Sequence, residues 1–141
     1  MARVLSVLVA LVVGVGSAAA VPRNADAASC VRFNTTNFNA PGDDNYNTNG
    51  EWVRIKNYCS TTKSVGSWRI HDYGTKHTYR FPSGVSIRPG YTLTLYTGVG
   101  SNTSTKRYWQ RSYGAVWNNR APEYAYLRNA AGTVVSKITE Y

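Results

Sequence analysis

Residues 51–57 read EWVRIKN and alternate apolar and polar side chains without interruption. Val53 and Ile55 take one face of the stretch, and Trp52, Arg54 and Lys56 take the other. A period of two residues is typical of a β-strand with one buried face. We therefore predict a strand here whose second face carries an indole ring and two cations.

Stretches of the same kind recur along the chain, separated by turn-forming residues at intervals of roughly ten positions. No useful helical period follows residue 27. The spacing predicts an all-β protein with about seven or eight short strands in two packed antiparallel sheets. The strands are expected at residues 30–34, 51–57, 68–73, 78–81, 91–97, 124–128 and 133–141.

The connections between these stretches have their own signals. Arg88-Pro89-Gly90-Tyr91 places Pro and Gly at the two central positions of a type II turn. Leu93 and Leu95, just after it, are expected to point inward. Residues 35–50 and 98–105 are expected as loops, and 108–117 as an irregular, aromatic-rich segment.

The first 27 residues have the organisation of a secretory signal peptide. A positive charge precedes an apolar run over residues 4–18, and small residues follow it. Two A-x-A cleavage positions fit, after Ala20 and after Ala27. A retained membrane anchor is the alternative, since the run approaches spanning length. We expect cleavage, a secreted domain over residues 28–141, and no stable membrane insertion after cleavage.

The remaining domain is small and strongly basic. Loss of Arg3, Arg23 and Asp26 leaves fourteen Lys and Arg against six Asp and Glu, a formal net charge of +8. A chain of this length can form one domain with a hydrophobic core. The excess of positive charge favours contact with anionic polymers or lipid head groups. Solubility alone is the alternative.

Cys30 and Cys59 are the only cysteines. Two cysteines in an exported chain are expected to form a disulfide. This bond would join the start of the first strand to the end of the second, which requires antiparallel strands or facing sheets. Two thiols and two distant histidines lack zinc spacing, so we expect no metal and no cofactor.

Several segments, taken in order, resemble one known family. It is the lamin-tail domain, an immunoglobulin-like β-sandwich, in its stand-alone secreted bacterial form. The matching segments are NGEWVRIKN (49–57), GSWRIHDYG (66–74), YRFPSGVSIRPGYTLTLYTGVG (79–100), VWNN (116–119) and EYAYLRNAAGTVVSKITEY (123–141). Together they cover most of residues 30–141. The family's usual Gly-Asp pair before the penultimate strand is replaced here by Ala121-Pro122-Glu123.

The resemblance implies a binding or scaffolding module. Domains of this family contact proteins and DNA in nuclear lamins and accompany secreted nucleases and other enzymes in bacteria. The family provides no catalytic residues to transfer to this chain.

The residues themselves point to no catalytic centre. His71 and His77 are expected to be solvated, with His71 outward and His77 beside a turn. His71 and Asp72 cannot form a dyad, because neighbours on a strand point to opposite faces. No G-x-S-x-G motif occurs. We expect a protein that is not an enzyme.

Residues 45–50, NYNTNG, imitate the start of a calcium-binding loop. Lys56 stands where the bidentate Glu of such a loop is required, and Asn replaces Asp. Turn formation by the Asn and Thr side chains is the preferred interpretation.

Two clusters combine rings with cations. The first is Trp52 with Arg54 and Lys56, and the second is the segment 106–113, KRYWQRSY. Rings beside cations can stack on bases or sugars while the cations meet phosphates. Packing of the indoles inside the sandwich is the alternative, and it is preferred for Trp68 and Trp117. The predicted binding residues are Trp52, Arg54, Lys56, Lys106, Arg107, Trp109 and Arg111.

The sequence thus predicts a secreted, non-catalytic binding module for an anionic polymer, either extracellular DNA or a cell-wall polymer. A protein-interaction module and a neutral carbohydrate-binding module are the alternatives. Salt-sensitive binding distinguishes the first function from the others, since it requires charge.

Export should leave a chain that begins at Val21 or Ala28. Intact-mass spectrometry of the protein from culture supernatant, with and without reductant, measures both cleavage and disulfide formation. A full-length mass would contradict cleavage, and a mass that reductant leaves unchanged would contradict the disulfide.

Overall fold

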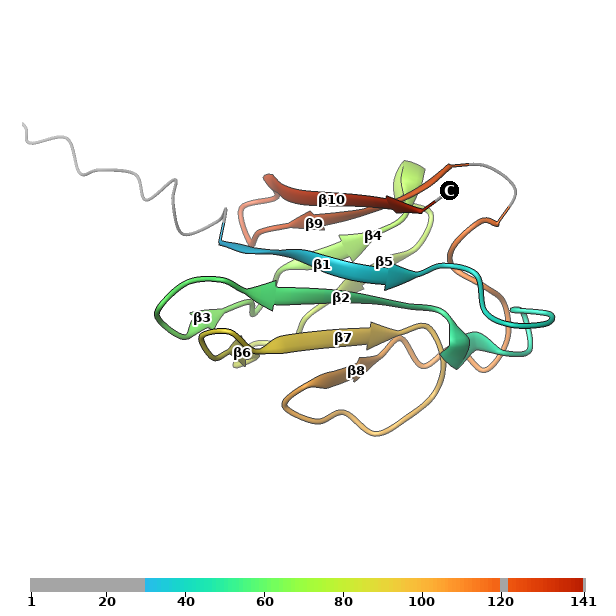
Figure 1. Cartoon of the computed structure of the whole chain (residues 1–141), viewed down its shortest axis with the longest axis horizontal. Helices are drawn as coiled ribbons and strands as arrows, with labels where there is room; N and C mark the ends of the chain where they lie inside the picture. The colour runs from blue at the N-terminus through green and yellow to red at the C-terminus, as the bar shows by residue number, and fades with distance from the viewer. Residues whose placement is uncertain (1–29, 120–121, 141) are drawn as a thin grey trace, which may run out of the picture.

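The computed structural model describes residues 30–119 and 122–140. The expected signal peptide and both cleavage positions lie outside the described residues. Strands form two four-stranded sheets and one two-stranded sheet (Figure 1). In the described part of the chain, no helix is long and apolar enough to cross a membrane.

The first sheet has the order β1-β2-β7-β8. Its strands are β1 (Val31–Asn37), β2 (Trp52–Asn57), β7 (Thr92–Tyr96) and β8 (Lys106–Tyr108). Neighbouring strands are antiparallel except β7 and β8, which run parallel. Parallel neighbours need a long connection, and the loop of residues 97–105 provides it.

The second sheet has the order β10-β9-β4-β5, with antiparallel pairs throughout. Its strands are β4 (Arg69–His71), β5 (Thr78–Arg80), β9 (Glu123–Arg128) and β10 (Val134–Glu140). A short pair, β3 (Lys63–Ser64) with β6 (Ser86–Ile87), forms the third sheet. Two 3-10 turns, η1 (Thr48–Gly50) and η2 (Tyr73–Thr75), lie in connecting segments.

The hydrophobic core lies between the two large sheets. Alternation along β2 buries Val53 and Ile55, and Leu93 and Leu95 of β7 are buried beside them. Ile70 and Leu127 face them from the second sheet. Side chains from the short pair and from loops complete the core: Val65, Phe81, Val85, Ile87, Phe38, Val116 and Trp117.

The two sheets also meet along one edge. β1 and β10 lie side by side there. The Phe33 amide donates to Oγ of Ser136 at 3.1 Å, and the Phe38 amide donates to Oε2 of Glu140 at 2.6 Å. Side chains of β10 therefore satisfy edge amides of β1 that backbone pairing leaves free, which keeps this edge closed to other strands.

Strand direction gives the sandwich two distinct ends. β1, β4, β7, β8 and β10 finish at one end, and β2, β5 and β9 finish at the other. We call the first the carboxylate end, because all six Asp and Glu residues of the described ranges lie at it or in its loops. The other is the basic end.

The predicted fold is confirmed: the protein is an all-β, immunoglobulin-like sandwich. The inward positions of Leu93 and Leu95 are confirmed. The turn at residues 88–91 is confirmed as well, since the Tyr91 amide donates to the Arg88 carbonyl at 3.1 Å and Gly90 has φ +75°.

The number of strands and their directions need correction. Residues 30–119 and 122–140 contain ten strands, where seven or eight were expected. β3, β6 and β8 were not predicted, because two or three residues cannot show an alternating pattern. The parallel pairing of β8 also contradicts the expectation of antiparallel sheets alone.

Cys30 and Cys59 form the predicted disulfide, with Cα atoms 5.4 Å apart. β1 begins directly after Cys30, β2 ends two residues before Cys59, and the two strands are antiparallel. The bond therefore joins one end of a strand pair that backbone hydrogen bonds already align.

Reduction of this disulfide should lower the free energy of unfolding by roughly 3–4 kcal/mol, because it frees a loop of about 30 residues in the unfolded chain. Urea unfolding of Cys30→Ala/Cys59→Ala beside the oxidised protein measures the difference. Equal unfolding midpoints with equal m-values would contradict the prediction.

Candidate binding surface

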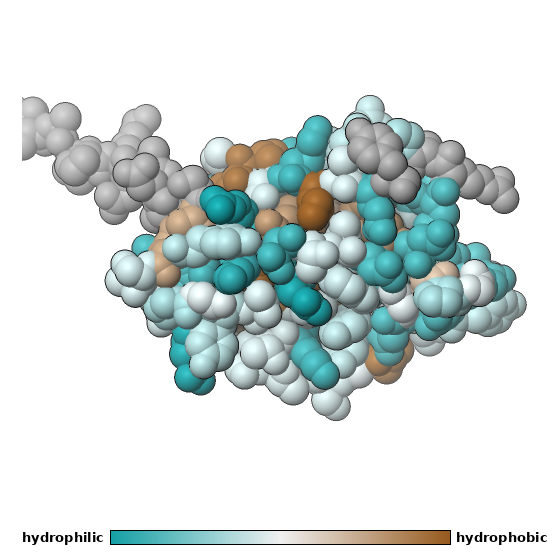
Figure 2. Space-filling model, in the orientation of Figure 1, coloured by the Kyte–Doolittle hydropathy of each residue, from teal (hydrophilic) through white to brown (hydrophobic). Residues whose placement is uncertain are grey.

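The outer face of the first sheet gathers cations and aromatic rings from four strands. Paired residues on neighbouring strands share a face, and the pairs here are Arg32 with Lys56, Arg54 with Thr94, Trp52 with Tyr96, and Lys106 with Thr94. We call this surface the basic aromatic face; it consists of Arg32, Trp52, Arg54, Lys56, Tyr58, Tyr96, Lys106 and Tyr108. Figure 2 shows hydrophilic residues among paler ones over this sheet.

The cations of this face lie over its rings. The Arg32 guanidinium is 4.1 Å from the ring centre of Tyr58, and the Lys56 ammonium is 5.1 Å from the same centre. Arg54 lies 4.8 Å from the Trp52 ring, and its Nε donates to Oγ1 of Thr94 at 2.9 Å. Cation–π contacts orient these long side chains, so the positive charges have preferred positions before any ligand arrives.

The predicted cluster at residues 106–113 is divided between several environments. Lys106 and Tyr108 reach the basic aromatic face, where Tyr108 stacks on Tyr96 with ring centres 5.2 Å apart. Arg107 pairs with Leu95, and its Nε is buried without a hydrogen-bond partner. The cluster is therefore not one surface.

Trp109 and Arg111 have structural contacts. The Trp109 ring packs edge-on against Tyr79 and Trp117, at 5.7 and 6.1 Å between ring centres. The Arg111 Nε donates to the Gly114 carbonyl at 3.0 Å. Of the seven predicted binding residues, the structure brings together Trp52, Arg54, Lys56 and Lys106. The preference for internal packing of Trp68 and Trp117 is confirmed, since both contact the core.

Arg32, Tyr58 and Tyr96 belong to this face but were not among the predicted binding residues. Arg32 alternates with buried Val31 and Phe33, and this outward position was readable from the sequence. Tyr58 and Tyr96 carry no comparable signal, because their membership depends on the pairing of β1, β2 and β7.

The carboxylates of the described residues accept hydrogen bonds mainly from backbone amides. Asp44 is the exception, since it accepts from the Asn119 side chain. Glu51 accepts from the amides of Val116 and Trp117, and Glu123 accepts from those of Tyr73, Asn118 and Tyr124. Glu140 accepts from the amide of Phe38, Asp43 from that of Asn45, and Asp72 from that of His77.

This use of the carboxylates leaves the cations without acidic partners. Across residues 30–119 and 122–140, one ion pair is found, between His77 Nδ1 and Asp72 Oδ2 at 2.8 Å. No Lys or Arg of these ranges forms an ion pair. The strands β1, β2, β7 and β8 contain no Asp or Glu. The positive charge of the basic aromatic face is therefore uncompensated within the described structure.

Glu51 is the most deeply buried of these carboxyl groups. Its side chain is fully buried at the start of β2, and it accepts from the amides of Val116 and Trp117 at 3.0 and 3.3 Å. Burial raises its pKa from the usual 4.5 to about 7, although these amides favour the charged form. The buried Thr97 hydroxyl also favours the charged form, although its geometry falls short of a hydrogen bond.

Both histidines differ from the expectation that they are solvated. His71 is buried, with its ring stacked on Tyr126 at 5.1 Å. Nδ1 of His77 lies 2.8 Å from Oδ2 of buried Asp72. The expectation failed because it considered strand direction alone, and neighbouring side chains cover the outward histidine. Within the described ranges, no three His, Cys, Asp or Glu residues are placed to hold a metal ion.

The segment 45–50 behaves as a turn-forming region. Oγ1 of Thr48 donates to the Arg111 carbonyl at 3.0 Å, and Oδ1 of Asn45 accepts from the Ala115 amide at 3.2 Å. Asn49 donates to the Val99 carbonyl at 2.9 Å. These side chains connect loops, which agrees with the preferred interpretation of this segment.

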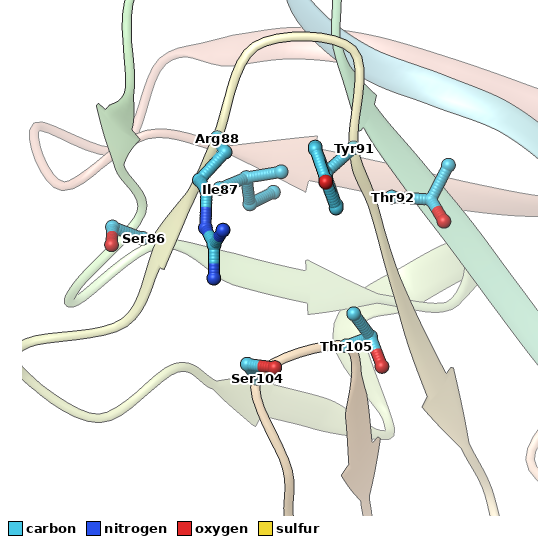
Figure 3. A pocket seen from close by; sticks show the side chains of 7 residues that line it. All are labelled: Ser86, Ile87, Arg88, Tyr91, Thr92, Ser104 and Thr105. Carbon is cyan, nitrogen blue, oxygen red and sulfur yellow. The ribbon is translucent and has the colours of Figure 1, made fainter.

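A pocket of about 220 Å³ lies at one edge of the first sheet (Figure 3). Hydroxyl side chains line much of it, and Arg88 extends into it from the β6–β7 turn. The full lining is Ser86, Ile87, Arg88, Tyr91, Thr92, Ser104 and Thr105. Thr92 pairs with Lys56 and Thr105 precedes Lys106, so the pocket continues from the basic aromatic face.

The arrangement of the two large sheets defines the class of protein, an immunoglobulin-like β-sandwich. More specifically, the chain belongs to the Lamin Tail Domain family, whose sequence model matches residues 24–141. The resemblance seen in the sequence is thereby confirmed. The family points to a non-enzymatic interaction module. A search of curated proteins found no match.

The free energy of unfolding should fall as pH rises from about 4.5 to 7, by up to roughly 3 kcal/mol. In this window the unfolded chain has lost the Glu51 proton while the folded chain retains it, so deprotonation favours unfolding. Urea unfolding across this range tests the effect. Glu51→Gln should flatten the profile, and an unchanged profile in this variant would contradict the assignment to Glu51.

Proposed function

We propose that this domain is exported and binds an anionic polymer, extracellular DNA or a cell-wall polymer, through the basic aromatic face. The observation that carries the proposal is that, among the described residues, the cations of this face have no acidic partners. Cations without intramolecular partners keep their full attraction for phosphate or carboxylate groups, and release of the polymer's counterions adds to affinity.

The shape of the face favours binding of a single polymer strand over insertion into the groove of a duplex. Four strands at about 4.8 Å spacing make a surface roughly 14 Å wide. The cations and rings belong to strands of this sheet, with Tyr58 directly after β2, and a face of this width exceeds the roughly 12 Å width of a duplex major groove. Such a surface suits contacts with the polymer backbone and stacking on exposed bases or sugars. We therefore expect binding that does not depend on the base sequence.

A neutral carbohydrate is the second candidate, and the pocket beside the face is what favours it. Hydroxyl groups with an exposed Tyr91 match the usual surroundings of a sugar. Trp109→Ala does not test this function, since Trp109 packs against the core. Trp52→Ala and Tyr91→Ala are the appropriate variants.

Lys56→Gln should weaken retention on heparin and single-stranded DNA and lower the slope of log affinity against log salt by about 0.7–0.9, because one phosphate contact is lost. Affinity chromatography and titration at low and moderate salt measure both quantities. Lys76→Gln is the matched control: it removes the same charge directly after η2, outside the face, and should leave the slope unchanged.

Two results would contradict this proposal. Failure of the protein to be retained at low salt on heparin, DNA and wall fractions is the first. The second is equal weakening by the Lys56 and Lys76 variants, which would show dependence on net charge alone. Binding to neutral glycans that salt does not change and that Trp52→Ala abolishes would favour the carbohydrate function instead.

A further inference from the structure

Three arginines form a row across the outer face of the second sheet, on the other side of the core. Arg69 pairs directly with Arg80 on β5 and with Arg128 on β9. Paired residues on neighbouring strands have Cα atoms about 4.5–5.5 Å apart. Like charges directly opposite each other on a sheet are destabilising. We call these residues the arginine row.

Nothing acidic offsets this repulsion in the described residues. None of the three arginines joins an ion pair. Glu123, on the same strand as Arg128, is five residues away at the carboxylate end, roughly 17 Å along the strand. Asp72 follows β4 but is bound to His77. The row lies at the basic end, where β5 and β9 finish.

Arg128 is held in a fixed position within the row. Its Nε donates to Nε2 of His71 at 2.8 Å, and its Nη1 donates to the Gly132 carbonyl at 2.8 Å. Nδ1 of His71 lies 2.7 Å from the Asp72 carbonyl and therefore carries the proton, which leaves Nε2 as an acceptor. A neutral, buried histidine thus positions a guanidinium whose remaining donors are free for a ligand.

Arg69 extends to the same turn. Its Nε is buried without a hydrogen-bond partner, and its Nη2 lies 3.3 Å from where a Cβ on Gly132 would be. Gly132 has φ +88° and no side chain, so the turn admits this guanidinium. Arg69 and Arg128 therefore converge beside Gly132, while Arg80 lies exposed on the other side of Arg69.

We propose that the arginine row binds a phosphate group. Guanidinium groups present paired N–H donors that match the oxygens of phosphate, and they bind it more strongly than neutral donors do. A phosphate dianion bound by Arg69 and Arg128, beside Arg80, would reduce the repulsion along the row. The site lies on the opposite sheet from the basic aromatic face, so it goes beyond the proposed function and does not depend on it.

Inorganic phosphate is the first probe, with sodium chloride of equal ionic strength as the control for screening. Phosphate should raise the Tm of the wild-type protein by several degrees beyond the chloride control, because a ligand that binds only the folded state stabilises it. Arg69→Gln should weaken phosphate binding at least tenfold by calorimetric titration. It should also raise the Tm in phosphate-free buffer, which a purely structural Arg69 would not do.

A short single-stranded oligonucleotide is the second probe, and it distinguishes a polymer phosphodiester from free phosphate as the source. A response to inorganic phosphate that Arg69→Gln removes supports a free-phosphate site. A rise in Tm with the oligonucleotide but not with inorganic phosphate supports a phosphodiester site, provided that Arg69→Gln removes it. This response is measured in the Lys56→Gln background. The proposal is overturned if neither probe exceeds the chloride control, or if Arg69→Gln responds as the wild-type protein does.

Arg32→Gln is the matched control, since it removes one arginine from the other sheet. It should lower retention on DNA and leave the response to inorganic phosphate unchanged. Loss of retention by this variant would overturn the arginine row alone if two further responses are absent: that of the wild-type protein to inorganic phosphate and that of Lys56→Gln to the oligonucleotide. A phosphate response without any retention would overturn the basic aromatic face alone.

Discussion

Hydrogen bonds from backbone amides to carboxylates, concentrated at one end of the sandwich, are the constraint on which the charge distribution depends. The buried Glu51 connects the start of β2 to the amides of Val116 and Trp117, and Glu140 connects β10 to the amide of Phe38. Amides without a strand or helix partner need acceptors when buried. The carboxylates meet this need and are consequently unavailable to the cations.

The structural role of the acids has a consequence for binding. With the carboxylates at one end, both outer faces of the sandwich carry cations that have no acidic partner within the described part of the chain. On the first sheet these cations lie over rings, as Arg54 does over Trp52; on the second sheet Arg69 and Arg128 converge near Gly132. The stability of the loops and the attraction for anions thus follow from the same arrangement, since each carboxylate that orders a loop leaves a cation unpaired.

Sequence reasoning worked where one strand carries the signal. The alternation in residues 51–57 predicted the buried and outward positions of β2, and the presence of just two cysteines in a chain expected to be exported predicted the disulfide. It was wrong where the position of a side chain depends on the pairing of several strands. The segment 106–113 was treated as one surface, yet Trp109 turns inward while Lys106 stays outward. β8 is only three residues long, so its direction depends on pairing with β7 and not on its own pattern.

The sequence by itself determined the all-β class, the family resemblance, the disulfide and the excess of positive charge, because these depend on local periodicity, motif order and composition. Only the tertiary structure decided which cations share a surface and which carboxylates are occupied. Arg69, Arg80 and Arg128 lie on three different strands and become neighbours only through strand register. Register arises from the packing of the whole core, and no single segment encodes it.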